Sequence, residues 1–152
     1  MSTTLTATPA VTARAFLDAL AEHDVDAAAA TADPEVEVVV HPLGVRDTTR
    51  DALRSVLGDL VTAFPDLRLT VQRLIVTGDV VTALVKVEGT QAAAYAGVVN
   101  QEKHIDLDQA WRLTIADGRI VAVAAYWCQQ QLYRRLAVKR FDQVTIVGGA
   151  LS

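Results

Sequence analysis

Two segments in the first half of the chain carry hydrophobic residues at helical spacing. In the first, Thr8 followed by Pro9 predicts a helix start, because a hydroxyl side chain caps the first turn and proline fits its first position. The residues expected to bury one face of this helix are Ala13, Phe16, Leu17 and Leu20. Asp24 predicts the cap of a short, alanine-rich helix over Val25–Thr31.

The clearest helical pattern ends at Phe64, where Pro65 prevents a further turn. Thr48 and Asp51 form a near capping box, with aspartate in place of the usual glutamate or glutamine, and predict that this helix begins there. Its apolar stripe consists of Leu53, Val56, Leu57, Leu60, Val61 and Phe64.

Most of the remaining hydrophobic residues alternate with polar ones, which is typical of strands with one buried face. A valine-rich first strand is expected over Glu35–His41. Later strands are expected from Leu67 and over Val80–Val87, Ala92–Val99, His104–Ile115 and Arg119–Cys128. Hairpin turns are predicted at Thr77-Gly78-Asp79 and at Asp117-Gly118.

This order of elements predicts an α+β fold, a cone-shaped roll in which three helices from the first half cover one face of a curved antiparallel sheet. A short closing helix is expected over Gln129–Val138. The length of 152 residues favours one domain, expected over 9–138, between a disordered tail (1–8) and an extension (139–152). Within the extension, Phe141–Val147 predicts either an edge strand or a segment that packs across a partner.

Composition narrows the function classes. Hydrophobic residues make up 51% of the chain and the formal net charge is −4, which indicates a globular protein and argues against nucleic acid as a partner. A single cysteine excludes an internal disulfide and a cysteine-based zinc site. The longest apolar run, Ile120–Cys128, is too short to span a membrane, and the polar N-terminus lacks the pattern of a signal peptide. We therefore expect a cytoplasmic protein without metal or cofactor.

A partner is expected on the sheet. The last strand, Val121–Trp127, is apolar at both parities, so that both of its faces should be covered. One face can meet the cavity of the cone, and the other would be exposed in a monomer. The pattern therefore predicts a homodimer through the convex face of the sheet.

The strongest candidate for chemistry is His41, which ends the first strand and precedes Pro42. Histidine titrates near neutral pH and is suited to removing a proton next to a carbonyl group. The alternative is a structural histidine at the rim of a pocket.

The long strand offers two aspartates and two inward side chains. Asp106 and Asp108 alternate with the apolar set and are expected to face solvent or the dimer interface, unless a bulge changes the register; of the two, Asp108 is the further candidate acid or base. Gln109 and Trp111 have the inward parity. Trp111 would be core or a flat wall for a ligand, and Gln109 would donate to a carbonyl or enolate oxygen.

The final strand adds Tyr126, which shares one face with Cys128. Alanines at 122 and 124 leave space above that face, so that Tyr126 is expected to hydrogen-bond an oxyanion in the cavity. Cys128 has no evident neighbouring base and is expected to be a small buried thiol at the pocket.

Three short motifs follow one another along the chain: Phe64-Pro65-Asp66-Leu67, then Gly89-Thr90-Gln91, then Asp117-Gly118-Arg119-Ile120. Together with the order of helices and strands, they resemble the SnoaL-like polyketide cyclases, which belong to the nuclear-transport-factor-like superfamily of cone-shaped α+β pockets. The resemblance implies a small cofactor-free cyclase of secondary metabolism that closes a ring in a hydrophobic polyketide-like substrate. The segment Val39–Gly44 is also similar to the ketosteroid isomerases, whose aspartate base precedes a proline, and this similarity places His41 in the role of base.

Several residues depart from these family patterns. Cys128 stands where SnoaL-like proteins often have aspartate, Phe16 stands roughly where ketosteroid isomerases have an oxyanion-hole tyrosine, and Gln91 replaces a histidine. Tyr95 matches the aromatic residue of the following segment. Phe16, Gln91 and Tyr95 are expected to contact substrate. The departures leave two mechanisms open, an aldol closure with His41 as base and a shape-driven closure. They also leave open a non-catalytic carrier and a dehydratase, isomerase or epoxide hydrolase of the same superfamily.

Overall fold

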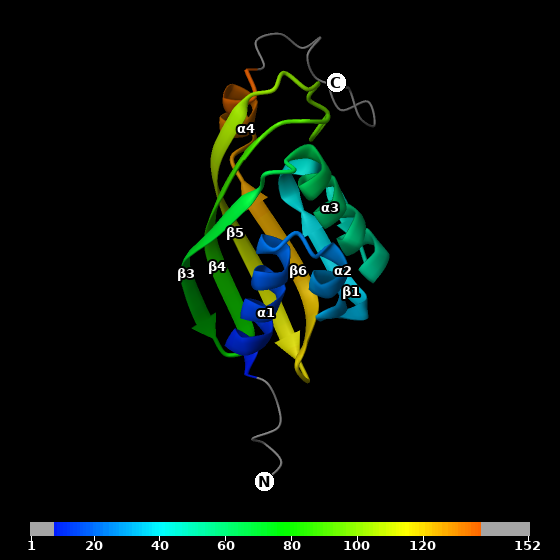
Figure 1. Cartoon of the computed structure of the whole chain (residues 1–152). Helices are drawn as coiled ribbons and strands as arrows, with labels where there is room; N and C mark the ends of the chain where they lie inside the picture. The colour runs from blue at the N-terminus through cyan, green and yellow to red at the C-terminus, as the bar shows by residue number, and fades with distance from the viewer. Residues whose placement is uncertain (1–7, 138–152) are drawn as a thin grey trace.

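The computed structural model describes residues 8–137 of the chain, and in it a row of helices packs on one face of a curved sheet (Figure 1). The elements in chain order are α1 (Pro9–Ala21), α2 (Val25–Ala30), β1 (Ala32–Val40), the short 3-10 helix η2 (His41–Leu43), β2 (Val45–Asp47), α3 (Arg50–Ala63), β3 (Arg68–Thr77), β4 (Val80–Thr90), β5 (His104–Ala116), β6 (Arg119–Trp127) and α4 (Gln129–Arg135). The predicted α+β roll is confirmed.

The six strands form one sheet in the order β2-β1-β6-β5-β4-β3. All neighbouring strands are antiparallel except β1 and β6, which run parallel, so the sheet is mixed. This parallel pair places the first large strand, β1, beside the last strand, β6. It thereby brings helices α1–α3 over the strands of the second half of the chain. Sequence periodicity carries no information on this pairing.

The two faces of the sheet differ in burial. Along β4 and β5 every second residue is buried, and the buried set packs with α1 and α3 in a single core. We call the side that faces the helices the inner face and the opposite side the outer face. The inner residues of β5 include Gln109, Trp111 and Leu113, and its outer residues include Asp108 and Arg112.

Two helix starts show how local sequence sets the fold. The hydroxyl of Thr8 accepts a hydrogen bond from the N–H of Val11, as the motif with Pro9 predicts. For α3 the predicted cap is wrong by one residue. The hydroxyl of Thr49, not that of Thr48, accepts from the N–H of Ala52, at 3.0 Å.

The strand predicted over Ala92–Val99 is also wrong. This segment is a loop closed by a pair of hydrogen bonds between Tyr95 and Val98. Positive φ angles at Ala96 (52°) and Gly97 (77°) turn the chain back there. A segment turned on itself in this way cannot join the edge of a sheet as a strand.

The first and last predicted elements differ at their ends. β1 begins at Ala32, earlier than expected, and stops at Val40, so His41 opens η2 instead of ending the strand. The closing helix ends at Arg135, before a positive φ at Ala137. The predicted tail, the extension 139–152 and the segment Phe141–Val147 lie outside the described residues. Among residues 8–137, no helix has the length and hydropathy needed to cross a membrane.

Candidate functional site

A buried pair of side chains marks the middle of the inner face. The indole N–H of Trp111 donates a hydrogen bond of 2.9 Å to the side-chain oxygen of Gln109. Both side chains are buried, with 2% of Trp111 and 5% of Gln109 exposed. Because an indole N–H can only donate, this bond fixes which end of the amide is the oxygen.

The amide nitrogen of Gln109 therefore points its two N–H groups elsewhere. None of the residues that the structure describes accepts a hydrogen bond from it. Among the described residues, every side-chain nitrogen or oxygen that solvent cannot reach has a hydrogen-bond partner. Because the Gln109 nitrogen has no partner, it must border accessible space. A ligand that covered this nitrogen without offering an acceptor would lose about 1–3 kcal/mol, so a ligand with a carbonyl oxygen at this point is favoured.

Small side chains flank Trp111 in the sheet. Its cross-strand partners are Ala83 on β4 and Ala125 on β6. Phe16 of α1 approaches the indole with ring centroids 5.9 Å apart and planes at 51°. The predicted inward placement of Phe16, Gln109 and Trp111 is thus confirmed, and these three side chains lie together.

Gln91 and Tyr95 hold the loop that follows β4. The amide nitrogen of Gln91, a residue with 1% exposure, donates to the carbonyl of Val98, and its oxygen accepts from the N–H of Gln101. Tyr95 packs edge-on against Phe64 with centroids 5.4 Å apart. Burial, with a smaller contribution from the Asp59 carboxylate, raises the pKa of the Tyr95 phenol far above its ordinary value. Tyr95 is therefore a neutral donor at every physiological pH.

His41 and Tyr126 lie together, but on the outer face. Their rings stack with centroids 4.6 Å apart and planes at 17°, and the Arg112 guanidinium carbon lies 5.9 Å from the centre of the Tyr126 ring. These residues, with Glu37, Val39 and Arg46, line a pocket of about 270 Å³. The expectation that Tyr126 faces the cavity is wrong, because its side chain projects from the face of the sheet opposite to that of Gln109.

Asp106 and Asp108 also lie on the outer face, as their parity predicts. The carboxylate of Asp106 pairs with the ammonium of Lys86 at 3.4 Å, and Asp108 is exposed. No bulge turns β5 inward at these positions, since its pairing with β4 is regular from Thr90 to Val80. In this structure neither aspartate reaches the inner face.

Cys128 is exposed, so the expected buried thiol is wrong. Its sulfur accepts a hydrogen bond from the N–H of Gln131 at 3.4 Å and caps α4. His23 is partly buried, and its Nε2 donates to the carbonyl of Leu67 at 2.7 Å, which ties the end of α1 to the start of β3. His104 is exposed, with its Nδ1 3.2 Å from the Thr90 hydroxyl.

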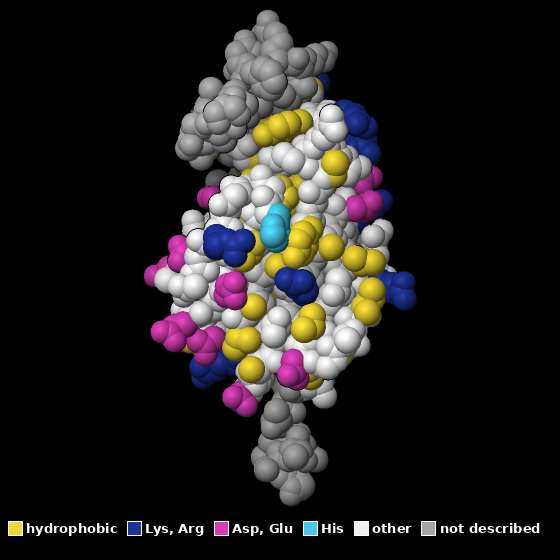
Figure 2. Space-filling model, turned by 180° about the vertical axis from the view of Figure 1, so that it is seen from behind, with side chains coloured by type: hydrophobic (Ala, Val, Ile, Leu, Met, Phe, Trp, Pro, Cys, Tyr) yellow, Lys and Arg dark blue, Asp and Glu magenta, His cyan; other side chains and the backbone are white. Residues whose placement is uncertain are grey.

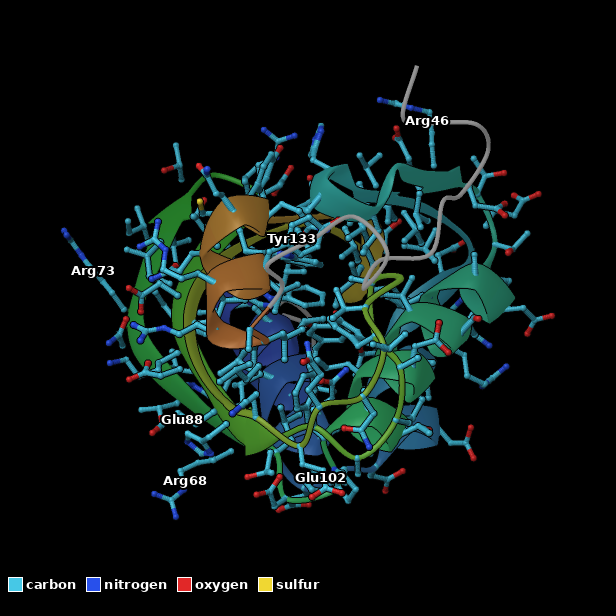
Figure 3. All side chains as sticks on the ribbon, turned by 90° about the horizontal axis from the view of Figure 1, so that it is seen from above. Arg46, Arg68, Arg73, Glu88, Glu102 and Tyr133 are labelled. Atoms are coloured by element: carbon cyan, nitrogen blue, oxygen red, sulfur yellow. The ribbon has the colours of Figure 1, made fainter. Side chains whose placement is uncertain are left out.

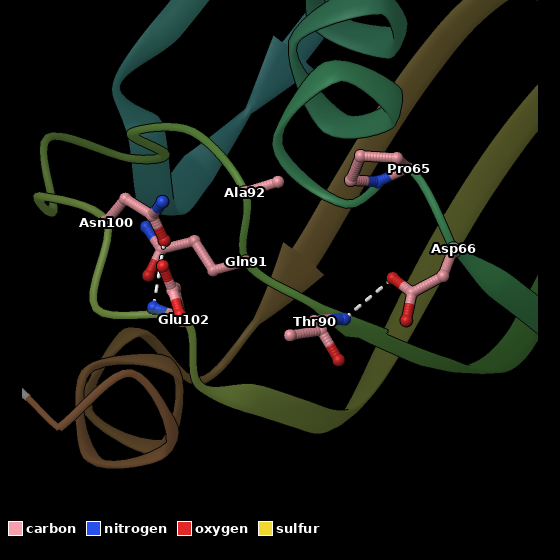
Figure 4. A pocket seen from close by; sticks show the side chains of 7 residues that line it. All are labelled: Pro65, Asp66, Thr90, Gln91, Ala92, Asn100 and Glu102. Carbon is pink, nitrogen blue, oxygen red and sulfur yellow. Dashed lines mark hydrogen bonds between the residues drawn. The ribbon is translucent and has the colours of Figure 1, made fainter.

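A second pocket, of about 470 Å³, lies beside the motif that follows α3 (Figure 4). Its lining residues are Pro65, Asp66, Thr90, Gln91, Ala92, Asn100 and Glu102. Asp66 accepts a hydrogen bond from the backbone N–H of Thr90 at 2.8 Å, and this bond lowers the pKa of its carboxyl group. The oxygen of Asn100 accepts from the N–H of Glu102. The polar groups of this pocket mainly hold its own backbone in place.

The inner face is poor in titratable groups. The buried polar side chains among residues 8–137 are Thr12, Gln91 and Gln109, together with the phenol of Tyr95. Within the same residues, no group of three His, Cys, Asp or Glu side chains has the arrangement of a metal site. The geometry therefore favours binding and hydrogen-bond donation over proton transfer by a carboxylate or imidazole.

Comparisons with known proteins agree with this fold. The SnoaL-like domain family matches residues 13–123. A candidate SnoaL-like polyketide cyclase from Jannaschia sp. CCS1 is 18% identical with a TM-score of 0.78, over 87% of this chain and 93% of that one. IdmH, a candidate polyketide cyclase from Streptomyces antibioticus, is 21% identical with a TM-score of 0.74, over 87% of this chain and 100% of that one.

A solved structure that is described as a hydroxylase, not as a cyclase, has the same fold. AclR from Streptomyces galilaeus, a candidate hydroxylase, is 17% identical with a TM-score of 0.75, over 87% of this chain and 97% of that one. No curated protein sequence matches the chain. At these identities the structural neighbours show the fold alone, whereas the family match covers most of the chain. The chain belongs to the SnoaL-like family.

Proposed function

We propose that this protein binds a hydrophobic, polyketide-like small molecule against the inner face and closes a ring in it by holding it folded. The observation that carries the proposal is the amide nitrogen of Gln109, an oriented donor that borders accessible space on an otherwise apolar surface. A substrate carbonyl at this point would satisfy the donor. It would also be polarised toward attack by an enol carbon of the same substrate, so that the new carbon–carbon bond forms as the carbonyl π bond breaks and the enol O–H proton passes to the new alkoxide oxygen.

The apolar surroundings suit the confinement of a flexible chain. The Trp111 ring, between Ala83 and Ala125, offers a flat surface for conjugated or aromatic parts of the substrate. Holding reacting atoms in a near-attack geometry lowers a barrier by several kcal/mol without any acid or base. The scarcity of titratable groups on the inner face supports this shape-driven closure over an aldol closure with a protein base.

The experiment is a binding and turnover assay with a linear poly-β-ketone thioester and its cyclised aromatic product as probes. Trp127 is replaced by Phe so that Trp111 is the sole tryptophan and its fluorescence reports on the inner face. We expect the linear probe to change the Trp111 emission and to cyclise faster than in buffer. Gln109→Leu, which keeps the approximate size of the side chain, should slow cyclisation about tenfold, the value of one hydrogen bond.

Two controls separate the roles of the residues. Trp111→Phe keeps an aromatic wall but removes the bond that orients Gln109, so it should lower the rate with little loss of binding. Gln129→Leu, made with Trp127 retained and followed by product formation, removes a similar amide that bonds Trp127 instead and should leave the rate unchanged. If Gln109→Leu cyclises as fast as the unchanged protein, the proposed role of the amide is wrong.

A second function, a non-catalytic carrier of the same molecules, is favoured by the same scarcity of acids and bases. Tight binding of both probes without cyclisation would establish the carrier. A dehydratase, an isomerase or an epoxide hydrolase would instead convert a hydroxy-ketone, an enone or an epoxide probe. The hydrolase is the least favoured of these, since a water-activating carboxylate is absent from the inner face over residues 8–137.

A further inference from the structure

Two hydrogen-bond donors on buried side chains have no acceptor among residues 8–137. Of the buried polar side chains, Thr12 donates to the carbonyl of Gly118, and Gln91 uses both ends of its amide. The other two are the amide nitrogen of Gln109 and the hydroxyl of Tyr95, which bonds no described residue. Because every described side-chain oxygen that solvent cannot reach has a partner, the Tyr95 hydroxyl also borders accessible space.

The backbone and the ring of Tyr95 are held without help from its hydroxyl. Its N–H and C=O both bond Val98, at 3.1 and 2.8 Å, and the Gln91 amide donates to the same Val98 carbonyl. The ring packs on Phe64, and only 6% of the residue is exposed. Seen from above, the loop that carries Tyr95 runs between α3 and α4 (Figure 3), and it is hydrogen-bonded to the ends of both helices. A donor fixed in this way loses little conformational freedom when it binds a ligand.

A series of contacts relates Tyr95 to the inner face. The Cβ of Phe64 lies 3.1 Å from the position of a Cβ on Gly89, and Gly89 pairs with Ile105 across the sheet. Ile105 and Gln109 are both buried residues of the inner face, four positions apart on β5. At about 3.3 Å per strand residue, this places the Tyr95 hydroxyl and the Gln109 amide on the order of 10 Å apart.

We propose that the Tyr95 hydroxyl is a second donor to the ligand of the inner face, and that this ligand is a long chain with an oxygen acceptor for each donor. One acceptor meets Gln109 and the other meets Tyr95. An extended chain advances roughly 3.4 Å for every three chain atoms, so about ten atoms separate the two acceptors. The inference rests on the proposed function, since it adds a second contact to the same ligand. It narrows the substrate class to a long chain oxygenated at several points.

The phenol donates without giving up its proton. Burial, with a smaller contribution from the Asp59 carboxylate, raises the pKa of Tyr95 far above its ordinary value. A group that stays protonated can hold a carbonyl or enol oxygen but does not act as a general base. Tyr95 therefore serves to bind and orient the ligand.

The test is the affinity of the full chain for two thioesters of equal length, read from the initial change in Trp111 emission in the Trp127→Phe background. One probe is the linear poly-β-ketone thioester, and the other is a saturated acyl thioester with a single carbonyl oxygen. Tyr95→Phe keeps the ring on Phe64 and should raise the Kd of the poly-β-ketone about fivefold, the value of one hydrogen bond. Gln109→Leu should do the same, and the double variant should show the product, about 25-fold.

Three controls separate this contact from other effects. The saturated thioester cannot bond both donors at once, so the two substitutions should not multiply for it. Tyr126→Phe removes the same atom from the outer face, where hydrophobic, basic and acidic side chains lie intermixed (Figure 2), and should leave both affinities unchanged. Tyr95→Phe removes a hydroxyl that bonds no described residue, so its Tm should equal or exceed that of the unchanged protein. A lower Tm would assign the hydroxyl to the fold and overturn the proposal.

The outcomes distinguish this inference from the proposed function. If Tyr95→Phe binds the poly-β-ketone as tightly as the unchanged protein, the second donor is wrong, while a slowed Gln109→Leu still supports ring closure. If the two substitutions multiply but no ring forms, the ligand is held at both points and the proposed cyclisation is wrong. Failure of the unchanged protein to bind the poly-β-ketone overturns both.

Discussion

The carboxylate of Asp66 accepts a 2.8 Å hydrogen bond from the backbone N–H of Thr90, which joins the segment after α3 to the end of β4. Directly before Thr90, a Cβ on Gly89 would lie 3.1 Å from the Cβ of Phe64 and 3.2 Å from the Asp66 carboxylate. Two of the three motifs that identify the family thus meet in one junction. Their role here is structural, which explains why they predict the fold and not the substrate.

Replacing Asp66 by Ala removes the acceptor for the Thr90 N–H. We expect a destabilisation of about 1 kcal/mol, because the bond is charged but the carboxylate is exposed and screened. Thermal unfolding at neutral pH should show a lower Tm. Asp66→Asn keeps a neutral acceptor and should lose less, and equal stability of all three proteins would contradict the role assigned to this bond.

The same bond gives stability a pH dependence with a defined sign. It lowers the pKa of Asp66 in the folded state below the ordinary value of 3.8, so the folded state favours the ionised form. This stabilisation is present above the ordinary value and is lost as the pH falls through the lowered pKa. The difference in unfolding free energy between the unchanged protein and Asp66→Ala should therefore be constant near neutral pH and shrink in acid. A difference that grows in acid would contradict the lowered pKa.

Gly89→Ala tests the close approach at the junction. The added methyl group would lie 3.1 Å from the Cβ of Phe64, closer than an ordinary van der Waals contact, and should cost about 1–3 kcal/mol. Gly58→Ala is the matched control, since a Cβ there meets nothing within 4 Å and the residue lies inside α3. That change should stabilise the protein by about 0.5–1 kcal/mol. In denaturant titrations, the unfolding free energy should fall for Gly89→Ala and rise for Gly58→Ala.

A pair of neighbouring threonines tests the start of α3. Thr49→Ala removes the hydroxyl that accepts from the Ala52 N–H and should cost about 1 kcal/mol. Thr48→Ala changes an exposed residue outside the cap and should be nearly neutral. If denaturant titrations showed a larger loss of stability for Thr48→Ala than for Thr49→Ala, the cap predicted from the sequence would be favoured over the one observed.

Periodicity was sufficient for much of the fold. The alternation along β5 placed Trp111 and Gln109 inward and Asp106 and Asp108 outward, because a regular strand has a strict period of two. The apolar stripe of α3 likewise predicted which of its residues pack into the core. These predictions depend only on local geometry, and the structure confirms them.

Predictions that depended on how distant strands pair were wrong where they concerned the face of the sheet. The sequence correctly put Tyr126 on one face of its strand with Ala122 and Ala124, but it could not say which face of the sheet that was. The answer depends on how β6 pairs with β1 and β5. The parallel pairing of β1 with β6 brings His41 against Tyr126 on the outer face, and no local pattern encodes that contact.

His41→Ala is the most direct test of how the ring would close. His41 is exposed and stacks on Tyr126 on the face opposite Gln109, so its removal should leave cyclisation within about twofold of the original rate. A general base contributes about 10²–10⁴ to a rate, so a loss of that size would identify His41 as the base. Tyr126→Phe, which keeps the stack and removes only the hydroxyl, should also be without effect. An unchanged rate in both variants, alongside a slowed Gln109→Leu, would place ring closure on the inner face.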